Sequence, residues 1–232
     1  MLEVQHISFS WGRAALLDDV SFSVAPGETV VLAGANGAGK TTLLRILAGL
    51  CRPSAGSVRA DGADTFARPL RYRRVLGYLA ESAPADPDLR VRDYLRYRAN
   101  LRGEMARKIR HRVSEAMGLC GLEPHADAYV GTLSFGLRKR TALAEALLLR
   151  PRFLLLDDLL AGLDPATRQS FGRILASVAS FAAVVVSGHE LDELARWATR
   201  FCVLRGGRVQ EAPTVSAART LLGVAPPPRG GA

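Results

Sequence analysis

The order of hydrophobic and polar positions divides the chain into strand-like and helix-like segments. Residues 2–33 combine loosely alternating stretches, LEVQHISFSW and VSFSV, with a turn at Pro26-Gly27, which predicts short strands joined by turns. The segment TVVLAG at residues 29–34 is a short apolar strand. Such a strand is typical of the centre of a parallel sheet, where both faces are covered.

The next section predicts a helix, then short strands, and then a helical region. LLRILAGL predicts a helix that ends near Gly49, and residues 53–80 return to short strands and turns. From about Asp86 to Leu133 apolar residues recur at helical spacing, so we expect amphipathic helices over VRDYLRYRANLRG and ARKIRHRVSEAMGLCGL. We interpret this section as a small helical lobe inserted into the sheet domain.

Helices and strands alternate through the rest of the chain. The predicted elements are a helix over GLRKRTALAEALLLRP that Pro151 stops, a strand at 153–157, a helix at 165–179, a strand at 183–187, a helix over ELDELARWA, and a hairpin over RFCVLRGGRVQ with Gly206-Gly207 at its turn. This alternation implies an α/β fold with a parallel sheet.

These elements predict one domain over residues 1–225 with a short tail. Its core comprises residues 1–86 and 136–225, and the helical lobe comprises residues 87–135. The tail at 226–232, within APPPRGGA, is predicted to be disordered because of its proline and glycine content.

Composition restricts the class of protein. With 232 residues, 48% of them hydrophobic, the chain can bury one well-packed core. No apolar run reaches the roughly 18 to 20 residues that span a bilayer, and the first residues do not resemble a secretory signal. Cys51, Cys120 and Cys202 are scattered, which favours reduced thiols over disulfides or metal ligation. We therefore expect a soluble intracellular protein.

The net charge of +9 comes mostly from arginine, with clusters at residues 71–74 and 96–112. Three interpretations remain open for these clusters: a solvated helical face, a surface near anionic lipid, or a nucleic-acid patch. Neither an aromatic platform nor a known binding module accompanies the charge, which argues against nucleic acid as a partner.

The segment Gly34–Thr41, GANGAGKT, predicts a phosphate-binding loop. It fits GxxxxGK[ST] and lies between a predicted strand and a predicted helix. Backbone N–H groups of such a loop turn inward on a β-phosphate, and the helix N-terminus adds its positive end. Lys40 supplies charge to the β and γ phosphates, and the Thr41 hydroxyl is a magnesium ligand. The residues assigned to nucleotide binding here are Gly34, Asn36, Gly37, Ala38, Gly39, Lys40, Thr41 and Thr42.

The run FLLLDDLLAGLD places two adjacent aspartates at the end of a buried strand. In enzymes with a phosphate loop, an acidic residue at the end of a neighbouring strand helps to hold magnesium. Asp157 is the first acid after the strand and is therefore the predicted magnesium ligand. Asp158 is then expected to face the attacking water.

Further motifs follow in a fixed order. They are Trp11, the phosphate loop, GYLAE at 77–81, LSFGL at 133–137, FLLLDD, AGLD at 161–164, and SGHE at 187–190 with His189. Together they resemble the ATP-binding cassette (ABC) ATPases, the nucleotide-binding subunits of ABC transporters, over about residues 2–222. The resemblance implies a P-loop NTPase fold of the ABC type, with a parallel core sheet, an N-terminal antiparallel β subdomain and an inserted helical subdomain.

The resemblance also implies roles for individual residues. Trp11 would stack on adenine, and Glu81 would join Thr41 and Asp157 at Mg²⁺. Asp158, His189 and Glu81 would form the catalytic set. Ser134 and Gly136, in the signature motif, would meet the γ-phosphate of ATP bound by an opposite subunit in a head-to-tail pair, which leaves homodimer and heterodimer open.

The family further implies a partner in the membrane. Coupling helices of an integral membrane permease would rest in a groove beside the helical lobe, which places this chain at the cytoplasmic face of the membrane. The absence of a long C-terminal extension argues against importers with regulatory domains, so we expect a subunit of an exporter.

Several residues depart from the family pattern. Glu81 replaces a glutamine, Phe135 and Leu137 replace a glycine and a glutamine of the signature, and Asp158 replaces a glutamate. A carboxylate one methylene shorter draws its oxygens back by roughly 1 to 1.5 Å, and misplacement on that scale costs about a hundredfold in rate. We therefore expect slow ATP hydrolysis. The alternative is a degenerate, nucleotide-gated regulatory subunit that pairs with a consensus ATPase.

Overall fold

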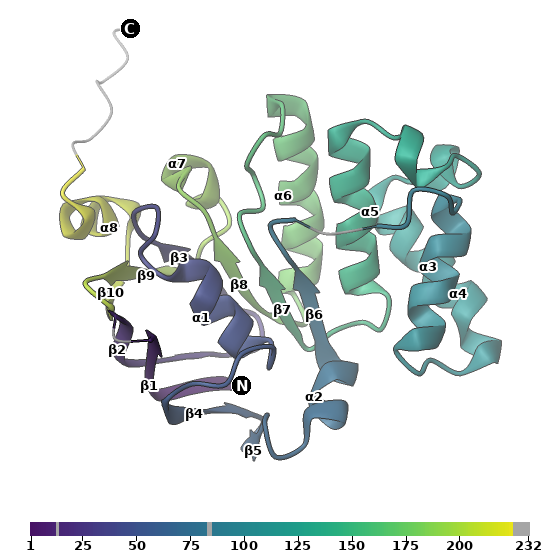
Figure 1. Ribbon diagram of the computed structural model, residues 1–232. Helices are drawn as coiled ribbons and strands as arrows, with labels where there is room; N and C mark the ends of the chain where they lie inside the picture. Colours follow the sequence, from purple (N-terminus) through teal and green to yellow (C-terminus); the bar gives the residue numbers. More distant parts are fainter. Residues whose placement is uncertain (13, 83–84, 225–232) are drawn as a thin grey trace, which may run out of the picture.

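The computed structural model describes residues 1–12, 14–82 and 85–224, which form two sheets and the helices around them (Figure 1). The smaller sheet is antiparallel and has the strand order β2-β1-β4-β5. Its strands are β1 (Leu2–Trp11), β2 (Ala14–Val24), β4 (Ala55–Ala60) and β5 (Ala63–Asp64). The predicted N-terminal antiparallel β subdomain is confirmed.

The larger sheet has the order β10-β9-β3-β8-β7-β6, and its strands run parallel from β9 to β6. The strand β10 pairs with β9 as an antiparallel hairpin, as the sequence predicted. The strands are β3 (Thr29–Ala33), β6 (Leu76–Leu79), β7 (Phe153–Leu156), β8 (Ala183–Ser187), β9 (Arg200–Arg205) and β10 (Arg208–Ala212).

The central strands are apolar along their whole length because each face of the sheet meets its own core. In β3, Val31 and Ala33 face one core, while Val30 and Leu32 face the other. Alternation of this kind follows from the two-residue period of a strand. The two cores fix the register of each central strand, because a slip by one residue would exchange the side chains of the two faces.

Different elements cover the two faces. The helix α1 (Lys40–Leu47) shares one core with the antiparallel sheet, whereas α5 (Phe135–Leu147) and α6 (Pro165–Ala179) belong to the core on the other face. The helices α3 (Val91–Leu101) and α4 (Ala106–Cys120) pack against α5, farther from the sheet (Figure 1). They form the inserted helical subdomain. Two short 3₁₀ turns, Glu123–His125 and Val130–Thr132, complete it.

The helical subdomain is inserted into the chain between β6 and β7, at one edge of the larger sheet. The chain leaves the sheet after β6 and returns at β7, and these two strands are paired neighbours at its edge. Arg102, at the end of α3, donates hydrogen bonds to the carbonyls of Leu76 and of Glu145. These bonds tie the end of α3 to β6 and to α5. Because β6 and β7 run parallel, the chain leaves the sheet at the carboxyl end of β6 and returns at the amino end of β7, with α5 between the insertion and β7.

Three helices differ from the prediction. The helix α2 (Pro69–Val75) lies in a section predicted to hold only strands and turns, and α8 (Val215–Leu222) was not predicted. The helix α7 is shorter than the predicted ELDELARWA and covers Leu191–Leu194. The reason is that Trp197 turns inward onto Gly172 of α6, and the N–H of Thr199, just before β9, then donates to the carbonyl of Thr29 in β3.

Two further expectations concern the ends and the membrane. The predicted disordered tail at 226–232 lies outside the described residues. Within residues 1–12, 14–82 and 85–224, no helix is both long enough and apolar enough to pass through a lipid bilayer.

Candidate functional site

The phosphate loop connects β3 to α1, and its backbone lies close to neighbouring strands. A side chain at Gly34 would place its Cβ 2.8 Å from the carbonyl oxygen of Leu204, so the residue has no room for one. Gly39 has a φ of +103° and is the N-cap of α1, a conformation that glycine adopts readily. The loop therefore opens directly onto the N-terminus of a helix, where backbone N–H groups attract anions.

Lys40 extends back over this loop. Its Nζ donates hydrogen bonds to the carbonyls of Gly34, at 2.7 Å, and Ala35, at 2.9 Å. Burial lowers the pKa of Lys40, while the charges of Asp158 and Asp157 oppose that shift. The lysine is thus a cation held between the loop and the two aspartates.

Asp157 is buried at the end of β7 with one oxygen engaged and one free. The residue is 1% exposed. Its Oδ1 accepts hydrogen bonds from Ser187 at 2.8 Å and from Thr41 at 3.2 Å. Its Oδ2 is buried and has no hydrogen-bond partner among the described residues. A buried carboxylate oxygen without a donor, next to a hydroxyl oxygen, is a donor set that suits Mg²⁺.

Asp158 has an unusual backbone conformation. Its φ is +47°, which is uncommon outside glycine and costs roughly 1 to 2 kcal/mol, although aspartate tolerates it better than most residues. Its N–H donates to Ser187 Oγ at 2.9 Å. Its Oδ1 lies 3.7 Å from Nδ1 of His189, which is also 3.6 Å from Glu190 Oε2. Backbone strain of this kind is typical of functional sites.

A cavity of about 310 Å³ brings most of the predicted site together. The predicted residues that line it are Asn36, Gly37, Gly39, Lys40, Thr41, Thr42, Glu81, Asp157, Asp158 and His189. They come from the phosphate loop and from the loops after β6, β7 and β8. In open α/β sheets, ligands bind at the carboxyl ends of the strands.

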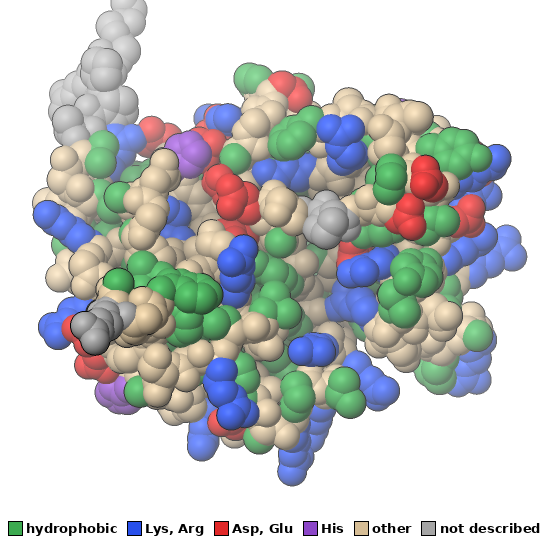
Figure 2. Space-filling view, in the orientation of Figure 1, with side chains coloured by type: hydrophobic (Ala, Val, Ile, Leu, Met, Phe, Trp, Pro, Cys, Tyr) green, Lys and Arg blue, Asp and Glu red, His purple; other side chains and the backbone are tan. Residues whose placement is uncertain are grey.

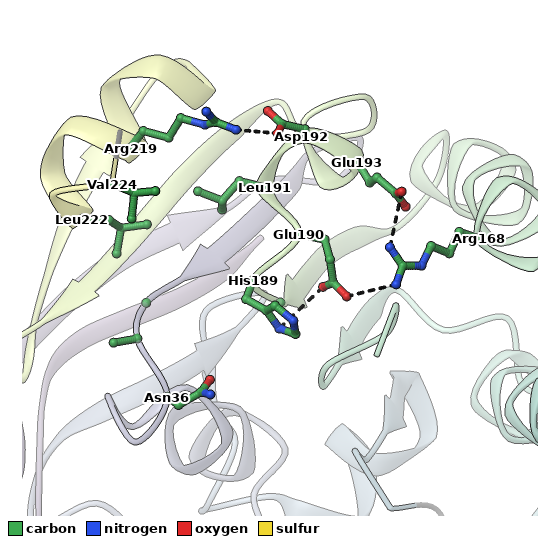
Figure 3. Close-up of a pocket in the computed structure, with 13 residues that line it drawn as sticks. Asn36, Arg168, His189, Glu190, Leu191, Asp192, Glu193, Arg219, Leu222 and Val224 are labelled. Carbon is green, nitrogen blue, oxygen red and sulfur yellow. Dashed lines mark hydrogen bonds and ion pairs between the residues drawn. The ribbon is translucent and has the colours of Figure 1, made fainter. Parts of the chain in front are cut away.

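A second cavity of about 640 Å³ adjoins the first and lies between α7, α8 and the start of the phosphate loop (Figure 3). It shares Asn36 and His189 with the smaller cavity. Arg168, which lines this cavity, forms two ion pairs there. Its Nη2 lies 3.6 Å from Oε1 of Glu190, and its Nη1 lies 3.3 Å from Oε1 of Glu193. The larger cavity is not lined by Lys40, Asp157 or Asp158, so the groups suited to phosphate and metal binding lie in the smaller one.

Five predicted residues do not line that smaller cavity. Trp11 is 63% exposed at the end of β1 and meets Phe9 edge to face, with 5.2 Å between ring centroids. Ala38 and Gly34 are not part of the cavity lining either, although Gly34 lines the larger cavity. Ser134 and Gly136 line a separate hollow of about 480 Å³ around the start of α5. One copy of the chain therefore does not bring the signature motif to its own phosphate loop.

Sequence reasoning missed Ser187 and Lys139. The Oγ of Ser187 donates a hydrogen bond to Oδ1 of Asp157 and accepts one from the N–H of Asp158. Ser187 is the first residue of the SGHE motif, in which only His189 was assigned a role. Lys139 is buried and donates to the carbonyls of Asp158 and Ala161. Its place in a run of basic residues gave no signal of burial.

Comparison with known proteins gives consistent matches. The family model described as "ABC transporter" matches residues 17–161, which is more than half of the chain. A curated relative named "Nod factor export ATP-binding protein I", from Paraburkholderia xenovorans, is 36% identical over 208 residues, covering 89% of this chain and 68% of the relative. A relative of the same name from Neorhizobium galegae is 31% identical and covers 96% of this chain and 65% of the relative.

Solved structures agree with the fold. An ATP-binding subunit of an ABC transporter matches with a TM-score of 0.85 at 28% identity, covering 97% of this chain and 94% of the other. The dimeric structure of MJ0796, a bacterial ABC transporter cassette, matches with a TM-score of 0.83 at 25% identity, covering 92% of this chain and 98% of that chain. These matches confirm the ABC type of P-loop fold, and the chain belongs to the ABC transporter family, as one of its nucleotide-binding domains.

Proposed function

We propose that this protein is an ATP-binding and ATP-hydrolysing subunit that energises export through a separate membrane permease. One observation carries the proposal: a phosphate loop ends beside a buried aspartate, Asp157, whose Oδ2 lacks a donor, and a second aspartate, Asp158, lies 3.7 Å from His189. This arrangement can bind a nucleotide phosphate, hold a divalent cation and orient a water molecule.

The phosphate-binding residues have separate roles in this proposal. The loop N–H groups and Lys40 bind the β and γ phosphates, which replace the Gly34 and Ala35 carbonyls as partners of the lysine. Thr41, Asp157 and Glu81 would hold Mg²⁺. When bound, the cation neutralises charge on the phosphate oxygens.

For hydrolysis, Asp158 orients the attacking water and accepts its proton, and His189 binds the γ-phosphate from the other side. Both residues line the cavity that contains Lys40. Turnover is expected to be slow, because Asp158 is one methylene shorter than a glutamate and because Glu81 adds negative charge near the γ-phosphate. If ATP binds and dimerises the protein without any turnover, the regulatory alternative replaces this proposal.

A second copy or a close relative is expected to complete the site. Ser134 caps α5 by accepting a hydrogen bond from the N–H of Leu137. The first residues of that helix line a hollow to which no residue of the phosphate loop contributes. In a head-to-tail dimer, Ser134 and Gly136 would meet the γ-phosphate bound by the other copy, and the exposed Trp11 would stack on adenine.

A groove of about 450 Å³ between α2 and α3 fits the permease. Its exposed leucines are Leu50, Leu70 and Leu101, which are 60%, 75% and 60% exposed. The exposed Arg73 and Arg74 border the groove, and basic side chains are dense over this part of the surface in Figure 2. An amphipathic coupling helix with an apolar face and carboxylates would fit it. The names of the relatives support export.

The test is Mg-ATP hydrolysis and assembly of the purified full chain. We expect ATP to shift the protein from monomer to dimer in light scattering, and phosphate release to be measurable but slow. Lys40→Ala should abolish both effects, because it removes the cation at the phosphates. A particle that stays monomeric with Mg-ATP, and binds no ATP in equilibrium dialysis, would overturn the proposal.

A further inference from the structure

Lys139 is a buried lysine on α5, the helix that begins next to Ser134. The residue is only 8% exposed. Its Nζ donates hydrogen bonds to the backbone carbonyls of Asp158, at 2.7 Å, and Ala161, at 3.1 Å. Lysine is almost never buried unless hydrogen bonds and opposite charges take the place of water. The surroundings of Lys139 should therefore explain its position.

Those surroundings are acidic. Burial lowers the pKa of Lys139, while Asp158, Glu190, Glu81 and Asp157 all raise it. These carboxylates follow three different strands, and Glu81, Asp157 and Asp158 line the cavity that contains Lys40. Lys139 is thus a second cation of the acidic site, and it approaches that site from the helical subdomain side.

The hydrogen bonds of Lys139 act on the strained turn after β7. The carbonyl of Asp158 is held by Lys139 from α5, and its N–H is held by Ser187 from β8. Both peptide groups next to the Asp158 Cα are therefore fixed by side chains of other elements. Because the φ of Asp158 is +47°, this conformation needs such support. The backbone conformation in turn sets the direction of the carboxylate.

We propose that Lys139 is a positioning residue that clamps the turn from Asp158 to Ala161, so that the short Asp158 carboxylate reaches the attacking water. This inference rests on the proposed ATP hydrolysis. It also assigns two tasks to α5, because Ser134 at its start serves the ATP of the partner copy while Lys139 holds the aspartate of its own copy. A displacement of α5 would then change the position of Asp158.

The first test measures kcat and KM for Mg-ATP in the full chain. Lys139→Met keeps the length of the side chain but removes its charge and its donors. We expect kcat to fall about tenfold or more with KM changed less than about threefold, because positioning affects the chemical step. Lys139→Arg should restore most of kcat. Lys108→Met on α4 makes the same chemical change at an exposed position and should leave kcat unchanged.

Other outcomes contradict the proposal. An unchanged kcat in Lys139→Met would show that the turn needs no clamp. A raised KM with a normal kcat would assign the lysine to binding. If kcat of Lys139→Arg is as low as that of Lys139→Met, the positive charge and its hydrogen-bond donors do not explain the loss of activity. Packing around residue 139 would then explain it.

The second test needs no turnover, so it separates failure of the clamp from failure of the proposed function. Hydrogen exchange, followed by mass spectrometry, is compared on peptides that cover residues 157–163 without nucleotide. Lys139→Met should accelerate exchange in this turn about tenfold, because the loss of two hydrogen bonds promotes local opening. Unchanged exchange in Lys139→Met would overturn the clamp even if the protein proves inactive. If the wild-type chain hydrolyses no ATP but Lys139→Met still accelerates exchange, only the proposed hydrolysis is overturned.

Discussion

At the scale of a single residue, the aspartate at position 158 suits the backbone in which it lies. Its φ of +47° falls in the left-handed region, which short polar side chains such as aspartate and asparagine occupy more often than longer ones. The same carboxylate faces His189 and has one oxygen, Oδ1, without a hydrogen-bond partner among the described residues. The backbone conformation thus favours a short acid at this position, and its free oxygen remains available to a water molecule.

Replacing the carboxylate by an amide tests its role with little change of shape. Asp158→Asn should lower kcat by about 10² to 10⁴-fold, the usual contribution of a positioned base, while ATP binding measured by fluorescence titration stays within about threefold. Asp19→Asn is the matched control, because Asp19 is exposed, also has a positive φ and lies on β2. If both variants keep wild-type kcat, Asp158 does not take part in hydrolysis.

The three cysteines should differ sharply in reactivity. Burial raises the pKa of Cys120 and of Cys202 to about 12, so their thiolate fraction at pH 8 is very small. Cys51 is partly exposed. We expect a maleimide reagent to modify Cys51 alone in the folded protein and all three residues after denaturation, as measured by intact mass. Rapid labelling of Cys120 or Cys202 in the folded chain would contradict the burial.

At the scale of elements, the contact between α6 and the segment after α7 is unusually close. A Cβ at Gly172 would lie 2.5 Å from the indole ring of Trp197. The ring therefore lies directly against the helix backbone, and it explains why α7 ends early. Sequence periodicity could not show this, because a glycine within a helical pattern normally indicates weakness in the helix.

This contact reverses the usual effect of a glycine-to-alanine change in a helix. Gly172→Ala should lower the free energy of unfolding by about 1 to 3 kcal/mol, because overpacking outweighs the gain in helix propensity. Gly118→Ala on α4 is the matched control, since its Cβ would meet only the flexible end of Glu123 at 3.1 Å. It should be neutral or stabilising by up to about 1 kcal/mol. Urea unfolding of both variants measures the difference.

The sequence predicted elements well where they were long or strongly apolar. The central strands β3, β7 and β8 and the helices α3 to α6 lie where the pattern placed them. The helix α2 has seven residues, too few for a period to show, and α8 was overlooked although Thr214 caps its start and Gly223 ends it. For the site, motif spacing located the phosphate loop and the two aspartates. It could not locate Lys139 or Ser187, whose roles depend on long-range packing.

At the scale of the whole molecule, the cavity that contains Lys40 and the groove between α2 and α3 have no lining residue in common within the described parts of the chain. The groove includes exposed leucines and the exposed Arg73 and Arg74. On the same helix and just before it, Arg71 and Arg68 border a different hollow. The two arginine pairs therefore offer the same charge on different sides of α2.

Charge reversal at these two pairs tests which side of α2 contacts the proposed permease. The double variant Arg73→Glu with Arg74→Glu should reduce about tenfold the fraction of the tagged full chain that is bound to membranes in the source organism. The reason is that the new glutamates would repel the carboxylates expected on the coupling helix. The control, Arg68→Glu with Arg71→Glu, should leave that fraction unchanged. Sedimentation of membranes followed by immunoblotting gives the measurement, and equal losses in the two variants would argue against a specific groove.

The inserted helical subdomain ends before α5 begins, so Lys139 lies outside it. The helix α5 packs against α3 and α4 on one side, and on the other its Lys139 donates to the carbonyls of Asp158 and Ala161. A chimaera that exchanges only residues 87–135 would therefore keep Lys139 and the turn that it supports. An exchange that extends through α5 would have to retain a lysine at position 139, or the recipient would hold an aspartate without this donor.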